Sequence, residues 1–182
     1  MQKRIGIIMH GVTGRMGMNQ HLIRSILEIR KQGGVALKDG TRLMPDPILI
    51  GRNPEKIEKL AKQYGVERFS IDLKKALQSK EDEIFFDAAS TQLRPKLLKQ
   101  AIEAGKHVYC EKPVSTTLAE ALDMYKAAKK AKVKHGVVQD KLRGPSAGSS
   151  PGPPWRRCAR IGPRWTRRSR PSWSCPPRPR PR

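Results

Sequence analysis

The sequence Gly11-Val12-Thr13-Gly14-Arg15-Met16-Gly17 places three glycines at intervals of three residues. The apolar run of residues 4–10 precedes it, has no helical period and predicts a strand buried on both faces. The segment that follows, from residue 15 to about residue 30, carries apolar side chains at three- and four-residue steps and predicts a helix. A glycine-rich turn between a strand and a helix is typical of sites that bind a dinucleotide pyrophosphate.

Each glycine of this turn has a separate expected role. We expect Gly11 to permit the tight turn, Gly14 to let a pyrophosphate approach the backbone, and Gly17 to let the helix pack closely on the strand. The free amides at the helix N-terminus and the helix dipole would then face the phosphates. The spacing is G-x-x-G-x-x-G instead of G-x-G-x-x-G, so a plain strand-to-helix turn stays an alternative. The residues expected to bind the cofactor here are Gly11, Thr13, Gly14, Arg15, Met16 and Gly17.

The rest of the first 142 residues alternates between strand and helix patterns. Helices are predicted after an Asn53-Pro54 start, after Asp72, and after the Thr117–Glu120 capping box. Residues 35–47, which contain two prolines, are predicted as a loop or a small hairpin. The alternation predicts an α/β fold of the Rossmann type, a doubly wound parallel sheet with strand order 3-2-1-4-5-6. The further strands are expected at residues 48–51, 66–70, 83–88, 107–110 and 134–139, and a further helix at residues 93–104.

The end of the second main strand predicts which cofactor is bound. An acidic residue there would bind the ribose 2′-hydroxyl of NAD, whereas an arginine accommodates the 2′-phosphate of NADP. The chain has Gly51-Arg52-Asn53 at this position and no carboxylate before Glu55. We therefore count Arg52 and Asn53 among the cofactor-binding residues and favour NADP over NAD. A solvated arginine in front of a helix is the alternative.

The run Ala104-Gly105-Lys106-His107-Val108-Tyr109-Cys110-Glu111-Lys112-Pro113 resembles the signature of the Gfo/Idh/MocA oxidoreductases. The glycine turn and the segments 51–55 and 136–139 also fall where that family has its nucleotide-binding elements, so the resemblance covers residues 3 to about 142. It implies a Rossmann domain followed by an α+β domain. It also implies NAD(P)-dependent oxidation or reduction of a sugar, a polyol or a related alcohol as a small-molecule substrate.

The same resemblance assigns a catalytic role to Lys112, which would lie near the nicotinamide and the reacting carbon. An ammonium beside the alcohol oxygen would stabilise the alkoxide that develops as hydride leaves. Glu111 would orient this lysine, and Pro113 would fix the turn. Ser90, Thr91 and Gln92 would line the cofactor at the same sheet edge, where they match the family in position but not in identity. A polar cap on the next helix is the alternative for these three residues.

The composition changes abruptly near Leu142. Residues 143–182 contain eleven arginines, ten of the fifteen prolines and all three tryptophans, but no lysine or acidic residue. These arginines raise the net charge from +11 for residues 1–142 to +22 for the whole chain. We expect a nucleotide-binding domain over residues 1–142 and a disordered tail over residues 143–182. A GC-rich gene read in the wrong frame explains this tail better than an evolved segment.

Nothing in the tail resembles the second α+β domain, so we expect a truncated chain that is weakly active or inactive. The apolar face left bare by a missing domain would drive association, and a homo-oligomer stays open. Two other functions are compatible with parts of the sequence. The arginines with Trp155, Trp165 and Trp173 could bind nucleic acid or an acidic surface, which we rank below the oxidoreductase. A dihydrodipicolinate reductase-like enzyme would share the glycine turn but lacks the Glu-Lys-Pro run, and an inert gene fragment is a further reading.

Hydropathy, the N-terminal pattern and the cysteine count predict where the protein is located and whether it binds a metal. No apolar run reaches about eighteen residues, so no membrane helix is predicted. The N-terminus has no secretory signal pattern, and Cys110 is the one cysteine of the first 142 residues. We therefore expect a cytoplasmic protein without a metal site or a disulfide framework.

Overall fold

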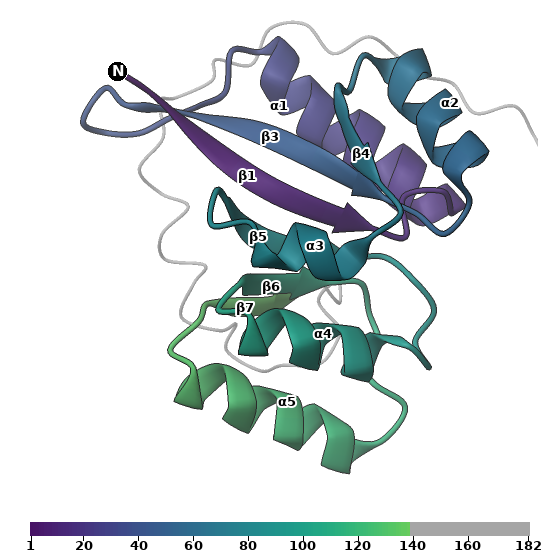
Figure 1. Cartoon of the computed structure of the whole chain (residues 1–182). Helices are drawn as coiled ribbons and strands as arrows, with labels where there is room; N and C mark the ends of the chain where they lie inside the picture. The colour runs from purple at the N-terminus through teal and green to yellow at the C-terminus, as the bar shows by residue number, and fades with distance from the viewer. Residues whose placement is uncertain (139–182) are drawn as a thin grey trace, which may run out of the picture. The chain divides into compact units, whose positions relative to one another are not determined.

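A computed structural model describes residues 1–138 of the chain (Figure 1). The predicted disordered tail of residues 143–182 lies outside the described residues. The strands are β1 (Gln2–His10), β2 (Val35–Ala36), β3 (Arg42–Ile50), β4 (Arg68–Ser70), β5 (Asp82–Asp87), β6 (His107–Cys110) and β7 (His135–Val137). The helices are η1 (Gly17–Leu27), α1 (Glu28–Lys31), α2 (Pro54–Tyr64), α3 (Leu73–Gln78), α4 (Arg94–Glu103) and α5 (Leu118–Lys130).

These strands form one doubly wound sheet of the Rossmann type. The order β3-β1-β5-β6-β7 is parallel throughout, and β4 pairs in parallel with the outer side of β3. Leaving β2 aside, this is the predicted order 3-2-1-4-5-6, which is confirmed. The register aligns His10 of β1 with Ile50 of β3 and Asp87 of β5, and aligns Asp87 with Cys110 of β6. The carboxyl ends of the central strands therefore lie at one edge of the sheet.

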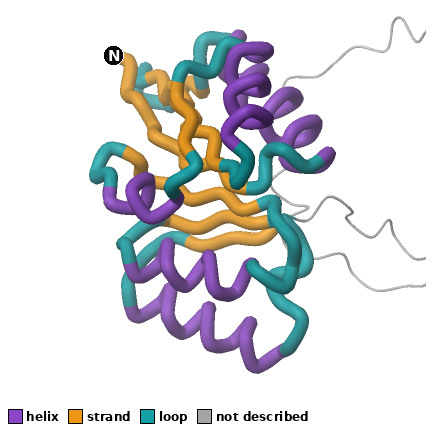
Figure 2. Tube along the Cα trace, turned by 45° about the vertical axis from the view of Figure 1, so that its right-hand side comes forward, coloured by secondary structure: helices purple, strands orange, loops and turns teal. Residues whose placement is uncertain are grey.

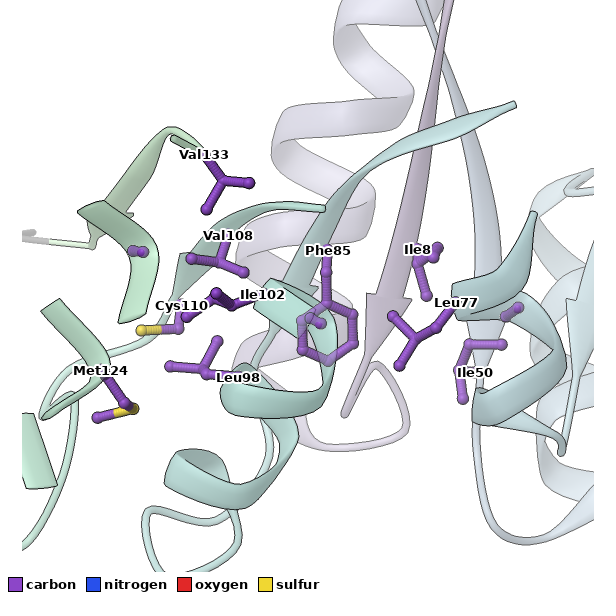
Figure 3. Packing of buried hydrophobic residues seen from close by; sticks show 13 residues of the cluster. Ile8, Ile50, Leu77, Phe85, Leu98, Ile102, Val108, Cys110, Met124 and Val133 are labelled. Atoms are coloured by element: carbon purple, nitrogen blue, oxygen red, sulfur yellow. The ribbon is translucent and has the colours of Figure 1, made fainter. Parts of the chain in front are cut away.

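Helices cover the sheet on both faces, as Figure 2 shows. Alternate residues of β1 point to opposite faces: Ile8 packs with the residues of α3, α4 and α5, whereas Ile7 and Met9 pack with those of η1 and α2. Figure 3 shows the first of these clusters, with Phe85 lying between Leu77 and Leu98. Burial of both faces explains why the strand sequences are continuously apolar.

The predicted loop at residues 35–47 is in fact largely a strand. β3 begins at Arg42 and pairs with β2 as an antiparallel hairpin, which was the second option for this segment. On the side away from β1, β3 pairs with β2 only at residues 42–43 and with β4 only at residues 48–50. Pro45 and Pro47 lie in the unpaired interval between, where a residue without an N–H breaks no hydrogen bond on that side.

The first helix is wound differently from the α-helix that was predicted. Residues 17–27 form a π-helix, and only residues 28–31 continue as an α-helix. Met18, Leu22 and Ile26 follow one another at four-residue intervals, which keeps one apolar stripe against the sheet in a wider helix. By contrast, the predicted caps are confirmed. Asn53 and Asp72 accept hydrogen bonds from the amides three residues ahead, at 2.9 Å and 3.0 Å.

Candidate functional site

A cleft of about 590 Å³ opens at the carboxyl ends of β1, β3 and β5. Ligands bind at this edge in doubly wound sheets, where the strand order reverses. The glycine turn forms one wall, and the first two turns of α4 contribute to another. The lining residues are His10, Gly11, Thr13, Gly14, Ile50, Gly51, Arg52, Ile71, Leu73, Ala88, Ala89, Ser90, Leu93, Lys96, Leu97 and Gln100.

The three glycines of the turn have different steric surroundings. Gly11 has a φ of +79°, and a Cβ added there would lie 2.4 Å from the amide nitrogen of Ala89. A Cβ on Gly17 would lie 2.4 Å from the carbonyl oxygen of Gly11, so the close helix packing needs a glycine. A Cβ on Gly14 would meet only this same oxygen, at 3.4 Å. The fold itself therefore does not require a glycine at position 14, and the space in front of it belongs to the cleft.

The cleft carries positive charge and lacks carboxylates. Arg52 follows β3, as predicted, and Lys96 of α4 adds a second cation that the sequence did not single out. None of the residues that line the cleft is an aspartate or a glutamate. The electrostatic potential of such a cleft favours an anionic ligand. The glycine turn at the N-terminal end of a helix favours the same kind of ligand.

Some residues named from the sequence lie beside the cleft instead of lining it. Asn53 uses its side chain to cap α2. Arg15 and Met16 are exposed at the start of the helical segment, and Thr91 and Gln92 lie in the turn before α4. Of the predicted residues Ser90, Thr91 and Gln92, only Ser90 lines the cleft.

The Glu111-Lys112-Pro113 segment follows β6 at the same sheet edge. The Glu111 carboxylate is buried and hydrogen-bonded to the Nε2 atom of His21 at 2.5 Å. It also accepts a hydrogen bond from the backbone amide of Lys112 at 3.1 Å. Glu111 therefore holds the backbone of the segment in place, while the side chain of Lys112 is exposed. The peptide bond between Lys112 and Pro113 is cis.

A buried polar cluster beneath the cleft was not predicted. Asp87, at the end of β5, is completely buried. One of its oxygens lies 2.8 Å from Nδ1 of His10, and the other accepts from Nε of Arg94 at 2.9 Å. His10 is therefore paired with a buried carboxylate and also lines the cleft. Arg94 gave no sequence signal because an arginine in the first turn of a helix is normally solvated.

A hollow of about 1080 Å³ lies at the opposite end of β1 and extends to β6 and β7. It contains no glycine turn and lies at the amino ends of the strands, so we do not assign it as the ligand site. Tyr109 and Val137 in this half of the sheet are exposed, but whether they drive the expected association stays a prediction.

The fold, the glycine turn and the cationic cleft together define a dinucleotide-binding Rossmann domain. The sequence profile of the GFO_IDH_MocA family, described as an oxidoreductase family with an NAD-binding Rossmann fold, matches residues 5–139. The chain belongs to this family, which confirms the resemblance seen in the sequence.

Individual relatives support the same assignment. The chain is 48% identical over 138 residues to a D-xylose dehydrogenase of Paenarthrobacter nicotinovorans, a match that covers 76% of this chain and 36% of that protein. It is 29% identical over 99 residues to a levoglucosan dehydrogenase of Pseudarthrobacter phenanthrenivorans, covering 54% of this chain and 25% of the relative. Among solved structures, levoglucosan dehydrogenase in complex with NADH and levoglucosan superposes with a TM-score of 0.63 at 24% identity, over 74% of this chain and 35% of the other.

The chain spans about a third of the length of these relatives. The likeness to the levoglucosan dehydrogenase structure is below 25% identity and supports the fold only. Among the described residues, no helix is long and apolar enough to cross a membrane.

Proposed function

We propose that this chain binds NADP in the cleft at the carboxyl ends of β1, β3 and β5 and serves hydride transfer to or from a sugar or related alcohol. The observation that carries the proposal is the open space at Gly14. The fold tolerates a side chain there, whereas a pyrophosphate lying against the backbone would not. Gly11, Thr13 and the amides at the start of the helical segment would hold the phosphates.

The choice of NADP over NAD rests on charge. Arg52 follows β3 at the position where the adenosine ribose is bound in Rossmann domains, and its planar guanidinium suits a phosphate. A carboxylate, which would repel a 2′-phosphate and bind the diol of NAD, is absent from the cleft lining. Asn53, which caps α2, would hold the backbone behind Arg52 in place.

Lys112 is the residue to which we assign catalysis. Bound nicotinamide supplies the hydride acceptor or donor. The exposed ammonium of Lys112, at the end of β6, would contact the alcohol oxygen and stabilise its developing negative charge. Glu111, fixed by His21, would keep the preceding backbone in position, and Ser90 would complete the wall on the β5 side.

The substrate class comes from the relatives. The name of the 48% identical protein, D-xylose dehydrogenase, supports a sugar. The described residues hold Lys112 but no element that would position a sugar carbon against the nicotinamide, and such positioning is worth about 7–11 kcal/mol of barrier. We therefore expect the described residues to support cofactor binding better than substrate turnover.

The test is a fluorescence titration of the purified chain with NADPH and with NADH, followed by a screen of pentoses and hexoses with NADP. We expect saturable NADPH binding, at least tenfold tighter than that of NADH, and slow turnover. Equal affinities for the two cofactors would overturn the NADP assignment. Absence of binding by either would overturn the proposed function.

A further inference from the structure

A buried guanidinium connects three segments at the carboxyl edge of the sheet. The side chain of Arg94, at the first position of α4, is only 2% exposed. Its Nε donates to Asp87 at 2.9 Å, and its Nη2 donates to the carbonyl oxygen of Ala89 at 2.6 Å. Its Nη1 donates to the carbonyl oxygen of Pro113. Each of the three guanidinium nitrogens therefore donates a hydrogen bond to a different acceptor.

Stability alone does not account for a charge at this position. Arg94 is followed on α4 by buried Leu98, Ala101 and Ile102, which continue the same helix face at i+4, i+7 and i+8. An apolar side chain at position 94 would extend that face. Replacing buried ion pairs by apolar residues of similar volume is often neutral or stabilising. An arginine contributes geometry here. Its planar guanidinium holds its N–H donors at fixed angles, which fixes the positions of the three acceptors relative to one another.

The acceptor on Pro113 directly follows Lys112 in the chain. Before the lysine, the backbone amide of Glu111 donates to the carbonyl oxygen of Asp87 at 2.8 Å. After the lysine, Arg94 holds the carbonyl of Pro113. The short segment that carries Lys112 is thus anchored to the end of β5 on one side and to α4 on the other.

We propose that Arg94 is a positioning residue that sets Lys112 beside the cofactor cleft by holding the carbonyl of Pro113. The inference rests on the proposed function, because the position of Lys112 matters for chemistry only if a nicotinamide nucleotide binds. Arg94 itself touches neither the cofactor nor the substrate. Its effect passes through the backbone of residues 111–113.

The variant that tests this is Arg94→Lys. A lysine keeps a cation against Asp87, so no buried carboxylate is left alone, but a single ammonium cannot reproduce the fork. The matched control is Arg68→Lys. Arg68 donates to both oxygens of Asp82, at 2.7 Å and 2.9 Å, and to Asp46 at 2.9 Å; Arg68 and Asp82 begin β4 and β5. Arg68→Lys removes the same kind of multiple guanidinium hydrogen bonds, but at the other end of the strands from Lys112.

The readout is the rate at which an N-hydroxysuccinimide ester acylates Lys112, followed by peptide mapping with and without saturating NADPH. We expect NADPH to slow this reaction at least fivefold in the wild type and in Arg68→Lys. In Arg94→Lys we expect less than twofold protection, although NADPH affinity changes by less than threefold. We expect both variants to lose thermal stability. If Arg94 had a purely structural role, NADPH would therefore protect Lys112 equally in both variants. Wild-type protection in Arg94→Lys, or no protection in a wild type that binds NADPH, overturns the inference.

A second measurement separates this inference from the proposed function. If the wild type binds neither NADPH nor NADH, the proposed function fails, and hydrogen exchange of residues 111–115 then decides the structural claim. Exchange at least tenfold faster in Arg94→Lys alone supports it, and unchanged exchange overturns it. If Arg94→Lys does not fold, the same measurements are made on the double variant Asp87→Asn/Arg94→Gln, which removes both buried charges together.

Discussion

Replacing Gly14 by alanine separates cofactor binding from folding. The added methyl group would lie 3.4 Å from the carbonyl oxygen of Gly11, an ordinary contact, and Gly14 does not have a positive φ. The folded state therefore accepts the change without strain. Because alanine restricts the unfolded chain more than glycine does, we expect the free energy of unfolding to rise by about 0.4–1 kcal/mol.

Gly14 itself lines the cleft, where the pyrophosphate would approach the backbone. We expect Gly14→Ala to weaken NADPH binding at least tenfold, which corresponds to about 1.4 kcal/mol. The assay combines NADPH fluorescence titration with thermal unfolding followed by circular dichroism. NADPH affinity equal to that of the wild type would refute the assignment of this turn to the pyrophosphate.

Gly17→Ala is the matched control. Its methyl group would lie 2.4 Å from the carbonyl oxygen of Gly11 and 3.0 Å from Cα of Val12, so the helix must shift. Overpacking of this kind costs about 1–3 kcal/mol. The melting temperature should therefore fall by several degrees in Gly17→Ala, whereas it should hold or rise in Gly14→Ala.

Further predictions concern charge and accessibility. Arg52→Ala should weaken NADPH binding about tenfold and leave NADH binding unchanged, as read by parallel titrations. Lys112→Ala should leave NADPH affinity within about threefold but abolish any NADP reduction by sugars. Burial by itself raises the pKa of Asp82, but the hydrogen bonds from Arg68 outweigh it, so the pKa lies below the ordinary 3.8. The Arg68–Asp82 pair therefore stabilises the folded chain above pH 3.8, and this stabilisation is lost as the pH falls through the lowered pKa. In urea unfolding between pH 5 and pH 2.5, the free energy of unfolding should decrease less in Asp82→Asn than in the wild type. Burial raises the pKa of the Cys110 thiol to about 11, so iodoacetamide should label Cys110 only as the chain unfolds.

The parts of the fold that could be predicted are those with local signals. Asn53 followed by Pro54 marks the start of α2, and Thr117 with Glu120 marks the start of α5. Buried strands between such helices leave only a parallel, right-handed arrangement, which is why the strand order could be derived. The glycine turn could also be predicted, because its geometry depends only on three glycines and on the strand and helix on either side of them.

The parts that were missed depend on context. Pro45 and Pro47 favoured a loop because proline cannot donate a backbone hydrogen bond to a neighbouring strand. Nothing in the local sequence shows that both prolines lie in an interval of β3 that is unpaired on one side. The wide winding of η1 has no local signal that we can name. These misses concern backbone geometry that only the neighbouring strands and helices define.

Within the site, the unpredicted residues pair across long stretches of sequence. His10 and Asp87 are 77 residues apart, and His21 and Glu111 are 90 residues apart. The first pair arises because the parallel strands β1 and β5 bring their carboxyl ends to one edge, and the second because η1 brings His21 against Glu111, which follows β6. The sequence therefore predicted where Lys112, Glu111 and the glycine turn lie, but not the buried partners His21, Asp87 and Arg94.

The proposed function requires that a nicotinamide dinucleotide binds in the cleft beside the glycine turn. The most direct measurement is an NMR titration of the ¹⁵N-labelled chain with NADP, followed through backbone amide shifts. We expect the largest shifts at residues 11–17, with smaller ones at residues 51–53 and 88–90. Shifts concentrated at the amino ends of the strands around residues 1–5, or no shifts up to millimolar NADP or NAD, would contradict it.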